Sequence, residues 1–210
     1  DADIPVIIVD RMVDVSDDSL YTTWIGTDAL CEGRKAAEWL NGFAEAKGIA
    51  ASDIHIADIQ GTIGSTAQIG RTKGLEQSGD DIDVVYCEND NEAFGAIDAI
   101  EAAGKTVGSD IANGEIMVIS FDTTHAGLQD VLDGKIECDV ECNPLHGPRA
   151  EELIKKLEAG EDIDKLNYVD EEIFAHDDTV KSVKATNSLD EEKDFDVTPL
   201  TQDILDKRAY

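Results

Sequence analysis

Short apolar runs alternate with segments of helical periodicity along most of this chain, and this alternation constrains the fold more than any other feature. A strict order of strand and helix is typical of a parallel sheet whose right-handed crossovers place helices on both faces. The sequence therefore predicts an α/β fold with a doubly wound parallel sheet. The expected strands are 4–9, 54–59, 82–86, 116–121 and 136–142, and the expected helices are 28–48, 65–76, 92–103, 124–132, 149–157 and 200–207.

Two segments have a distinct composition. The run at 4–9 is continuously apolar, which is typical of a strand buried on both faces of its sheet. After Ala175 the pattern weakens, and the stretch around 190–194 is highly charged and poor in β-forming residues. We therefore expect a buried strand at the start and an irregular segment before the final helix.

The charge balance of the chain disfavours negatively charged partners. The chain has 17 Lys and Arg against 47 Asp and Glu, which gives a formal net charge of −30. Phosphate backbones and anionic membrane surfaces would both repel it, so we expect no nucleic-acid partner. No run approaches the about 18 apolar residues that a membrane span requires. We also expect no direct membrane insertion, and a signal peptide that has been removed.

Cysteine and histidine spacing predicts no metal or cofactor. The closest cysteines, Cys138 and Cys142, lie on one predicted strand roughly 13 Å apart, too far for a disulfide. The four histidines are scattered without metal-ligand spacing. The glycine-containing loop at 61–65 lacks the Gly-Lys-Ser/Thr sequence of a phosphate-binding loop. The remaining cysteines, Cys31 and Cys87, have the character of small buried hydrophobic residues.

Polar side chains follow the predicted strands where a ligand would bind. In an open parallel sheet, ligands bind beyond the carboxyl ends of the strands. Carboxylate, guanidinium and carboxamide groups can donate and accept in fixed pairs, which suits the recognition of neighbouring hydroxyl groups. The candidate ligand-binding residues are Asp10, Arg11, Arg71, Asn89 and Asp122.

Each candidate also has a structural interpretation. Asp122 precedes a predicted helix and could act as its N-cap, and either Asn89 or Asp90 could cap the helix that follows them. Asp10 could simply form an ion pair with Arg11, and Arg71 could lie on the surface of its helix. No nucleophile elbow and no nucleophile–base pair is evident, so the residues do not indicate an enzyme.

The segments 4–11, 59–65 with 71–74, 88–96 and 119–122 resemble the type I periplasmic sugar-binding proteins of ABC transporters, in their ribose and galactofuranose branch. The tail at 206–210 is similar to the galactofuranose side of this family. The resemblance implies that Asp10, Arg11, Arg71, Asn89 and Asp122 contact the sugar. It also implies that Cys142 occupies the place of a family glutamine, a contact this chain does not keep.

The resemblance further implies an incomplete chain. Family members begin well upstream, and they carry an additional strand and helix between residues 77 and 81, where this chain has only the short segment 78–80. A strand would then be missing from the middle of the sheet, which would expose backbone donors. The expected parts are a remnant of the N-terminal lobe at 1–27, the C-terminal lobe at 28–142, a return segment to the N-terminal lobe at 143–171, and a final strand with the C-terminal tail at 172–210.

The function implied by the resemblance is that of a non-catalytic receptor. It would bind a monosaccharide, a pentose or hexose that includes furanose forms, without a cofactor, and deliver it to the permease subunits of an ABC importer. We expect a monomer located outside the cytoplasm, in a periplasm or on the cell surface as a lipoprotein. Two alternatives remain: the effector-binding core of a sugar-responsive transcription regulator, and a carbohydrate hydrolase.

Overall fold

A computed structural model describes residues 4–74 and 82–210 and divides the chain into two compact units. The smaller unit comprises residues up to Asp28 together with Asn143–Glu171. The larger unit comprises Ala29–Cys142 and Glu172–Tyr210. The chain thus leaves the larger unit once, after Cys142, and returns to it at Glu172.

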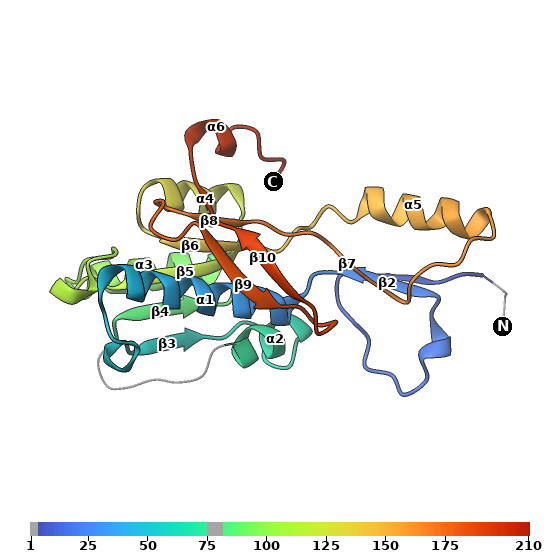
Figure 1. Cartoon of the computed structure of the whole chain (residues 1–210), viewed down its shortest axis with the longest axis horizontal. Coiled ribbons are helices and arrows are strands. Elements are labelled where there is room, and N and C mark those ends of the chain that lie inside the picture. Colours follow the sequence, from blue (N-terminus) through green and yellow to red (C-terminus); the bar gives the residue numbers. More distant parts are fainter. Residues whose placement is uncertain (1–3, 75–81) are drawn as a thin grey trace. The chain divides into compact units, whose positions relative to one another are not determined.

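The larger unit is built on a six-stranded sheet with the order β11-β8-β6-β5-β4-β3. Figure 1 labels five of these strands, β3, β4, β5, β6 and β8. The strands β3 to β6 are mutually parallel, β8 runs antiparallel to β6, and β11 is parallel to β8. The prediction of a parallel α/β sheet is therefore confirmed for its central strands. The strands are β3 (Ile56–Ile59), β4 (Val84–Cys87), β5 (Met117–Asp122), β6 (Cys138–Glu141), β8 (Ile173–Ala175) and β11 (Thr198–Pro199).

Helices cover both faces of this sheet. One core joins the first helix, α1, to one face of the strands. A second core joins α3, α4 and α6 to the other face, and α2 packs against α1. No helix within residues 4–74 and 82–210 is long and apolar enough to span a bilayer. The helices are α1 (Ala29–Lys47), α2 (Thr66–Gly74), α3 (Asp90–Ala102), α4 (His125–Leu132) and α6 (Gln202–Leu205), with short 3-10 helices at Ala51–Asp53 and Ile111–Asn113.

The expectation of a strand missing from the middle of the sheet is wrong. Strands β3 and β4 pair directly, from Ile56 opposite Val84 to Ile59 opposite Cys87. Among the described residues β3 is an edge strand, so a shortened connection leaves the interior hydrogen bonding intact. The segment 77–81 itself lies outside the described residues.

The prediction of a β-poor stretch near residue 190 is also wrong. Strands β9 (Ser182–Thr186) and β10 (Glu192–Asp196) form an antiparallel hairpin. Its outer face carries cross-strand charge pairs, such as Lys184 with Glu192 at 3.4 Å, while Val183 is buried. Such a hairpin needs few apolar residues because only one face packs on the core.

The smaller unit contains a three-stranded parallel sheet of order β1-β2-β7. Ile25, Leu153 and Val169 form its core. The prediction that the first apolar run is buried on both faces is wrong: Ile4 is 73% exposed and β1 has only β2 beside it among the described residues. The elements are β1 (Ile7–Val9), a 3-10 helix (Asp18–Leu20), β2 (Thr23–Gly26), α5 (Gly147–Glu158) and β7 (Leu166–Tyr168).

Candidate functional site

A buried arginine lies at the centre of the polar site in the larger unit. The Arg71 side chain is only 5% exposed. Its Nε donates to Glu32 Oε2 at 2.8 Å, and its Nη1 donates to the backbone oxygen of Glu88. The guanidinium also lies over the Phe121 ring, 4.7 Å from the centroid. These contacts exclude the alternative of a surface arginine.

The charge and one donor of Arg71 remain available at this site. Burial alone would lower the pKa of Arg71, but the Glu32 carboxylate beside it raises that pKa overall, so the guanidinium stays charged. The buried Nη2 has no hydrogen-bond partner within residues 4–74 and 82–210. It lies 3.6 Å from Asp122 Oδ1, which is too long for a hydrogen bond. A hydroxyl group could therefore accept from Nη2 while donating to the carboxylate.

Asp122 is presented by a strained turn at the end of β5. Asp122 has φ 103° and Thr123 has φ 53°, both in the left-handed region that non-glycine residues rarely adopt. The helix-cap alternative does not apply to Asp122, because Thr124 caps α4 by accepting from the Gly127 amide. Burial raises the pKa of Asp122 to about 7, against the lowering effect of Arg71.

Two buried carboxyl groups hold this turn. Asp90 accepts from the Ser120 hydroxyl at 2.7 Å and from the amide and hydroxyl of Thr124 at 2.8 and 2.6 Å. Asp139 accepts from the Thr123 amide at 3.3 Å. Burial raises the pKa of both acids, and that of Asp139 lies well above its usual value. The sequence indicated Asp90 only as a possible helix cap and gave no sign of Asp139, because the partners of both residues lie far away along the chain.

Substitution of a helical glycine tests the support that Asp90 gives to the turn. A Cβ at position 127 would lie 2.3 Å from Asp90 Oδ2, so Gly127→Ala must displace this carboxylate. We expect a loss of about 1–3 kcal/mol in the free energy of unfolding, measured by urea denaturation. Gly95→Ala is the matched control, since a Cβ on Gly95 in α3 meets nothing within 4 Å. It should stabilise the protein by about 0.5–1 kcal/mol, and equal effects of the two variants would contradict the packing described.

The pH dependence of stability tests the protonation of Asp139. Its raised pKa means that the folded protein keeps a proton that the unfolded chain releases above about pH 4. This contribution is present below that pH and is lost as pH rises toward the folded-state pKa, by up to about 1.4 kcal/mol per pH unit. Urea unfolding of Asp139→Asn between pH 4.5 and 7.5 should therefore show a smaller loss of stability with pH than the wild type. The exposed control Asp98→Asn should retain the wild-type dependence, and an unchanged slope in Asp139→Asn would contradict the assignment.

Asn89 is the N-cap of α3. Its side-chain oxygen accepts from the Glu92 amide at 3.0 Å, and its Nδ2 donates to Glu92 Oε1 at 2.7 Å. The loop after β3 packs on this cap, since the Gly61 amide donates to Glu88 Oε2 at 3.0 Å. A carboxamide has two hydrogens and two acceptor lone pairs, so capping leaves part of its capacity unused. A sugar contact by Asn89 stays a prediction.

Asp10 and Arg11 belong to the smaller unit. Asp10 has φ 67°, and its backbone is fixed by bonds from its amide to Ile25 and from Trp24 Nε1 to its oxygen. Arg11 Nε lies 3.8 Å from Asp10 Oδ2, and both side chains are about 60% exposed. The two side chains thus form the exposed ion pair that was the structural alternative for them. Arg71, Asn89 and Asp122 lie together in the larger unit, and a common site that includes Asp10 and Arg11 stays a prediction.

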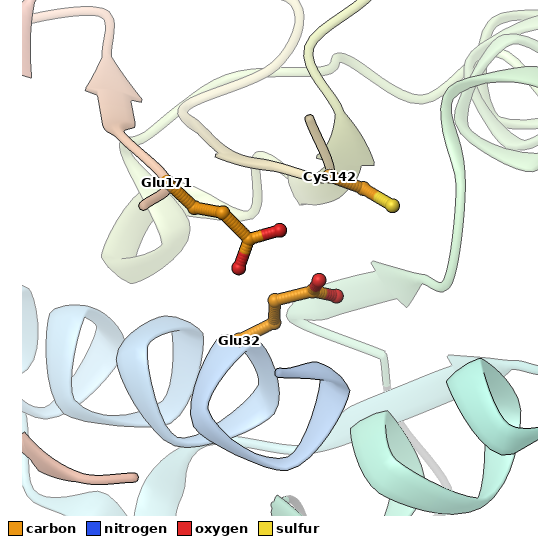
Figure 2. Close-up of side chains that lie close together, drawn as sticks. All are labelled: Glu32, Cys142 and Glu171. Carbon is orange, nitrogen blue, oxygen red and sulfur yellow. The ribbon is translucent and has the colours of Figure 1, made fainter. Parts of the chain in front are cut away.

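Cys142 follows β6 at the point where the chain leaves the larger unit. Its side chain is drawn in Figure 2 with that of Glu32, the residue of α1 that pairs with Arg71. Glu171, the third side chain drawn, belongs to the smaller unit. None of the four cysteines, all of which lie in the described part of the chain, forms a disulfide. A family contact at position 142 would thus be replaced by a weak thiol donor.

No family model matches this chain, but several known proteins are similar to it. It is 27% identical to the galactofuranose-binding protein YtfQ of Escherichia coli, a match that covers 90% of this chain and 68% of that protein. It is 36% identical to the ribose import binding protein RbsB of Bacillus subtilis over 65% of this chain and 43% of that protein.

Solved structures of sugar-bound proteins are also similar to this chain. A Mycobacterium smegmatis protein in complex with β-D-fucofuranose is 35% identical, with a TM-score of 0.70 over 84% of this chain and 66% of that chain. The binding component of the arabinose ABC transporter from Shewanella sp. ANA-3, bound to α- and β-L-arabinofuranose, is 28% identical, with a TM-score of 0.71 over the same shares. The chain spans about two thirds of the length of YtfQ and of these two solved structures, and less than half of the length of RbsB.

The described part of the chain has the fold of the type I periplasmic binding proteins, because its structure matches theirs. The homologues of this chain are the galactofuranose-binding and ribose import binding proteins of ABC transporters. The resemblance seen in the sequence is confirmed. These relatives are named as binding proteins, and the Shewanella protein is named as the periplasmic binding protein component of its transporter.

Proposed function

We propose that this chain is the ligand-binding part of an extracytoplasmic receptor that captures a monosaccharide for an ABC importer. The observation that carries the proposal is the pair formed by Arg71 and Asp122. A charged, buried guanidinium keeps one donor without a partner among the described residues, and a carboxylate lies 3.6 Å from it. Two neighbouring hydroxyls of a sugar could satisfy both groups at once.

A furanose is the favoured ligand form. Two of the solved relatives contain furanoses, β-D-fucofuranose in one and L-arabinofuranose in the other. YtfQ, which matches 90% of this chain, is named for galactofuranose. We therefore include pentoses and hexoses in their five-membered ring form as candidate ligands.

The complete site would include residues of both units. We propose that Asp10, Arg11, Arg71, Asn89 and Asp122 all contact the sugar, and that the larger unit corresponds to the C-terminal lobe of the relatives. Binding to both lobes at once favours a closed form, which permease subunits would recognise. The receptor would act as a monomer, without a cofactor, in a periplasm or anchored to the cell surface as a lipoprotein.

A thermal-shift panel on the complete gene product tests this function. Methyl β-D-galactofuranoside, L-arabinose and D-fucose are compared with methyl α-D-glucopyranoside, which is fixed in the six-membered ring. A bound sugar at a hundred times its Kd stabilises the folded state by about 2.7 kcal/mol, which raises Tm by several degrees. We expect this increase for at least one sugar with an accessible furanose form and none for the glucopyranoside.

Two further observations distinguish the alternative functions from a sugar receptor. Release of reducing sugar from a glycoside panel would instead indicate a hydrolase. A basic helix-turn-helix encoded upstream would indicate a transcription regulator, which the net charge of −30 disfavours. A panel in which no sugar changes Tm would overturn the proposed function.

A further inference from the structure

The last residues of the chain bind back onto the larger unit. Arg208 is only 11% exposed, and its guanidinium donates to Glu141 Oε1 at 2.6 Å, to Thr123 Oγ1 at 3.1 Å and to Glu172 Oε2 at 2.9 Å. The Tyr210 hydroxyl also donates to Glu141 Oε1. We call Arg208 and Tyr210 the C-terminal clasp.

The clasp joins the two points at which the chain leaves and returns to the larger unit. Glu141 is the last residue of β6, one residue before the exit, and Glu172 is the first residue after the return. These two residues are already paired, since the Glu141 amide donates to Glu172 O at 3.0 Å and the Glu172 amide donates to Glu141 Oε2 at 2.9 Å. Arg208 adds a charge-assisted bond to each carboxylate, so three separate segments are fixed to one another.

The clasp also reaches the strained turn that presents Asp122. Thr123 is fully buried in a left-handed conformation that costs free energy for a β-branched residue. Its amide is held by Asp139, and its hydroxyl accepts from Arg208. Asp139 thus holds the backbone of Thr123, and Arg208 holds its side chain.

Aromatic rings keep the guanidinium in place. The Arg208 guanidinium carbon lies 5.0 Å from the centroid of the Phe174 ring on β8 and 4.8 Å from that of Tyr210. Stacking against both rings restricts its rotation. The Arg208 guanidinium is thus held both by hydrogen bonds and by two aromatic rings.

We propose that Arg208 is a positioning residue for sugar binding, which holds Thr123 so that Asp122 faces the ligand. This inference rests on the proposed function, and Arg208 itself touches Thr123, Glu141, Glu172 and Tyr210 rather than the sugar. Loss of the clasp would leave Asp122 chemically unchanged but free to leave the left-handed conformation. Affinity should then decrease because the carboxylate must be ordered again on binding.

The experiment compares Arg208→Ala with Lys207→Ala in the complete gene product. Lys207 is an exposed neighbour that pairs only with Asp203 among the described residues, four positions earlier on the same turn. Hydrogen exchange of the Thr123 and Thr124 amides reports the turn directly, and calorimetry with the best sugar of the panel reports affinity. We expect Arg208→Ala to accelerate exchange of these amides and to weaken sugar binding, each about tenfold or more. Lys207→Ala should change neither.

Arg208→Lys and Tyr210→Phe refine the test. Arg208→Lys keeps the charge, but a lysine cannot contact two carboxylates and a hydroxyl at once as the arginine fork does. This variant should therefore bind sugar more tightly than Arg208→Ala and less tightly than the wild type. Tyr210→Phe removes one bond to Glu141 and keeps the ring over the guanidinium, so its effect should be smaller than that of Arg208→Ala.

Unchanged exchange at Thr123 and Thr124 in Arg208→Ala would overturn the inference, and so would faster exchange with unchanged affinity. Failure of the proposed function has a different signature, since the wild-type protein would then bind no sugar. The exchange measurement would still decide whether Arg208 holds the turn.

Discussion

Asp122→Asn should weaken monosaccharide binding about a hundredfold or more, measured by isothermal titration calorimetry. A carboxylate can accept from two sugar hydroxyls, and a hydrogen bond to a charged group contributes about 1.5–3 kcal/mol. The amide that replaces it carries no charge and presents only one acceptor oxygen. It would also direct a donor toward the Arg71 guanidinium, whose Nη2 lies 3.6 Å from Asp122 Oδ1.

The control for this variant is Asp133→Asn at the end of α4. Asp133 is an exposed aspartate of the same unit that accepts from Gln129. The Asp133→Asn variant should bind sugar with the affinity of the wild type. Wild-type affinity in Asp122→Asn would remove Asp122 from the site.

Arg71→Met should lower the free energy of unfolding by about 3–5 kcal/mol, because it leaves the fully buried carboxylate of Glu32 without its ion-pair partner. The Glu88 carbonyl would lose a donor as well. Urea denaturation of the single and double variants measures the effect. The double variant Glu32→Gln with Arg71→Met should recover part of the loss, since no buried charge then remains.

Arg149→Met provides the comparison with a surface ion pair. Arg149 lies 4.0 Å from a fully exposed carboxylate, that of Asp170. Pairs of this kind contribute about 0–1 kcal/mol. A loss in Arg71→Met as small as that in Arg149→Met would contradict the buried environment described for Arg71.

The alternation of strands and helices was predictable because burial on a sheet imposes a simple pattern. The segments 117–119 and 84–86 are continuously apolar, and both lie in central strands. Helix α1 repeats its apolar positions at helical spacing, and Trp39 and Phe43 indeed enter the core. The local sequence was sufficient to predict these strands and this helix, because the pattern of apolar residues in each element reflects which of its faces are buried.

The environment of β6 could not be predicted in the same way. Its alternation of Cys138 and Val140 with Asp139 and Glu141 is typical of a strand with one face in water. Both faces are nevertheless buried. Asp139 is enclosed at the turn after β5, and Glu141 is covered by the C-terminal clasp. These partners lie at distant positions in the sequence, so no spacing reveals them.

The candidate site was predicted in part. Strand-end position indicated Asp122 and Asn89, because ligand sites in open sheets lie at the carboxyl ends of strands. The same rule did not reveal Glu32, which is placed beside Arg71 by the packing of α1 against α2. A buried arginine requires a carboxylate partner, but the choice among the 47 acidic residues depends on the tertiary structure.

The central claim is that Arg71 and Asp122 bind the hydroxyl groups of a monosaccharide. A crystal structure of the complete gene product with its best-binding sugar tests this claim most directly. We predict that the sugar lies within hydrogen-bonding distance of Arg71 Nη2 and of the Asp122 carboxylate. A sugar bound elsewhere, with both groups turned toward other protein atoms, would contradict the account.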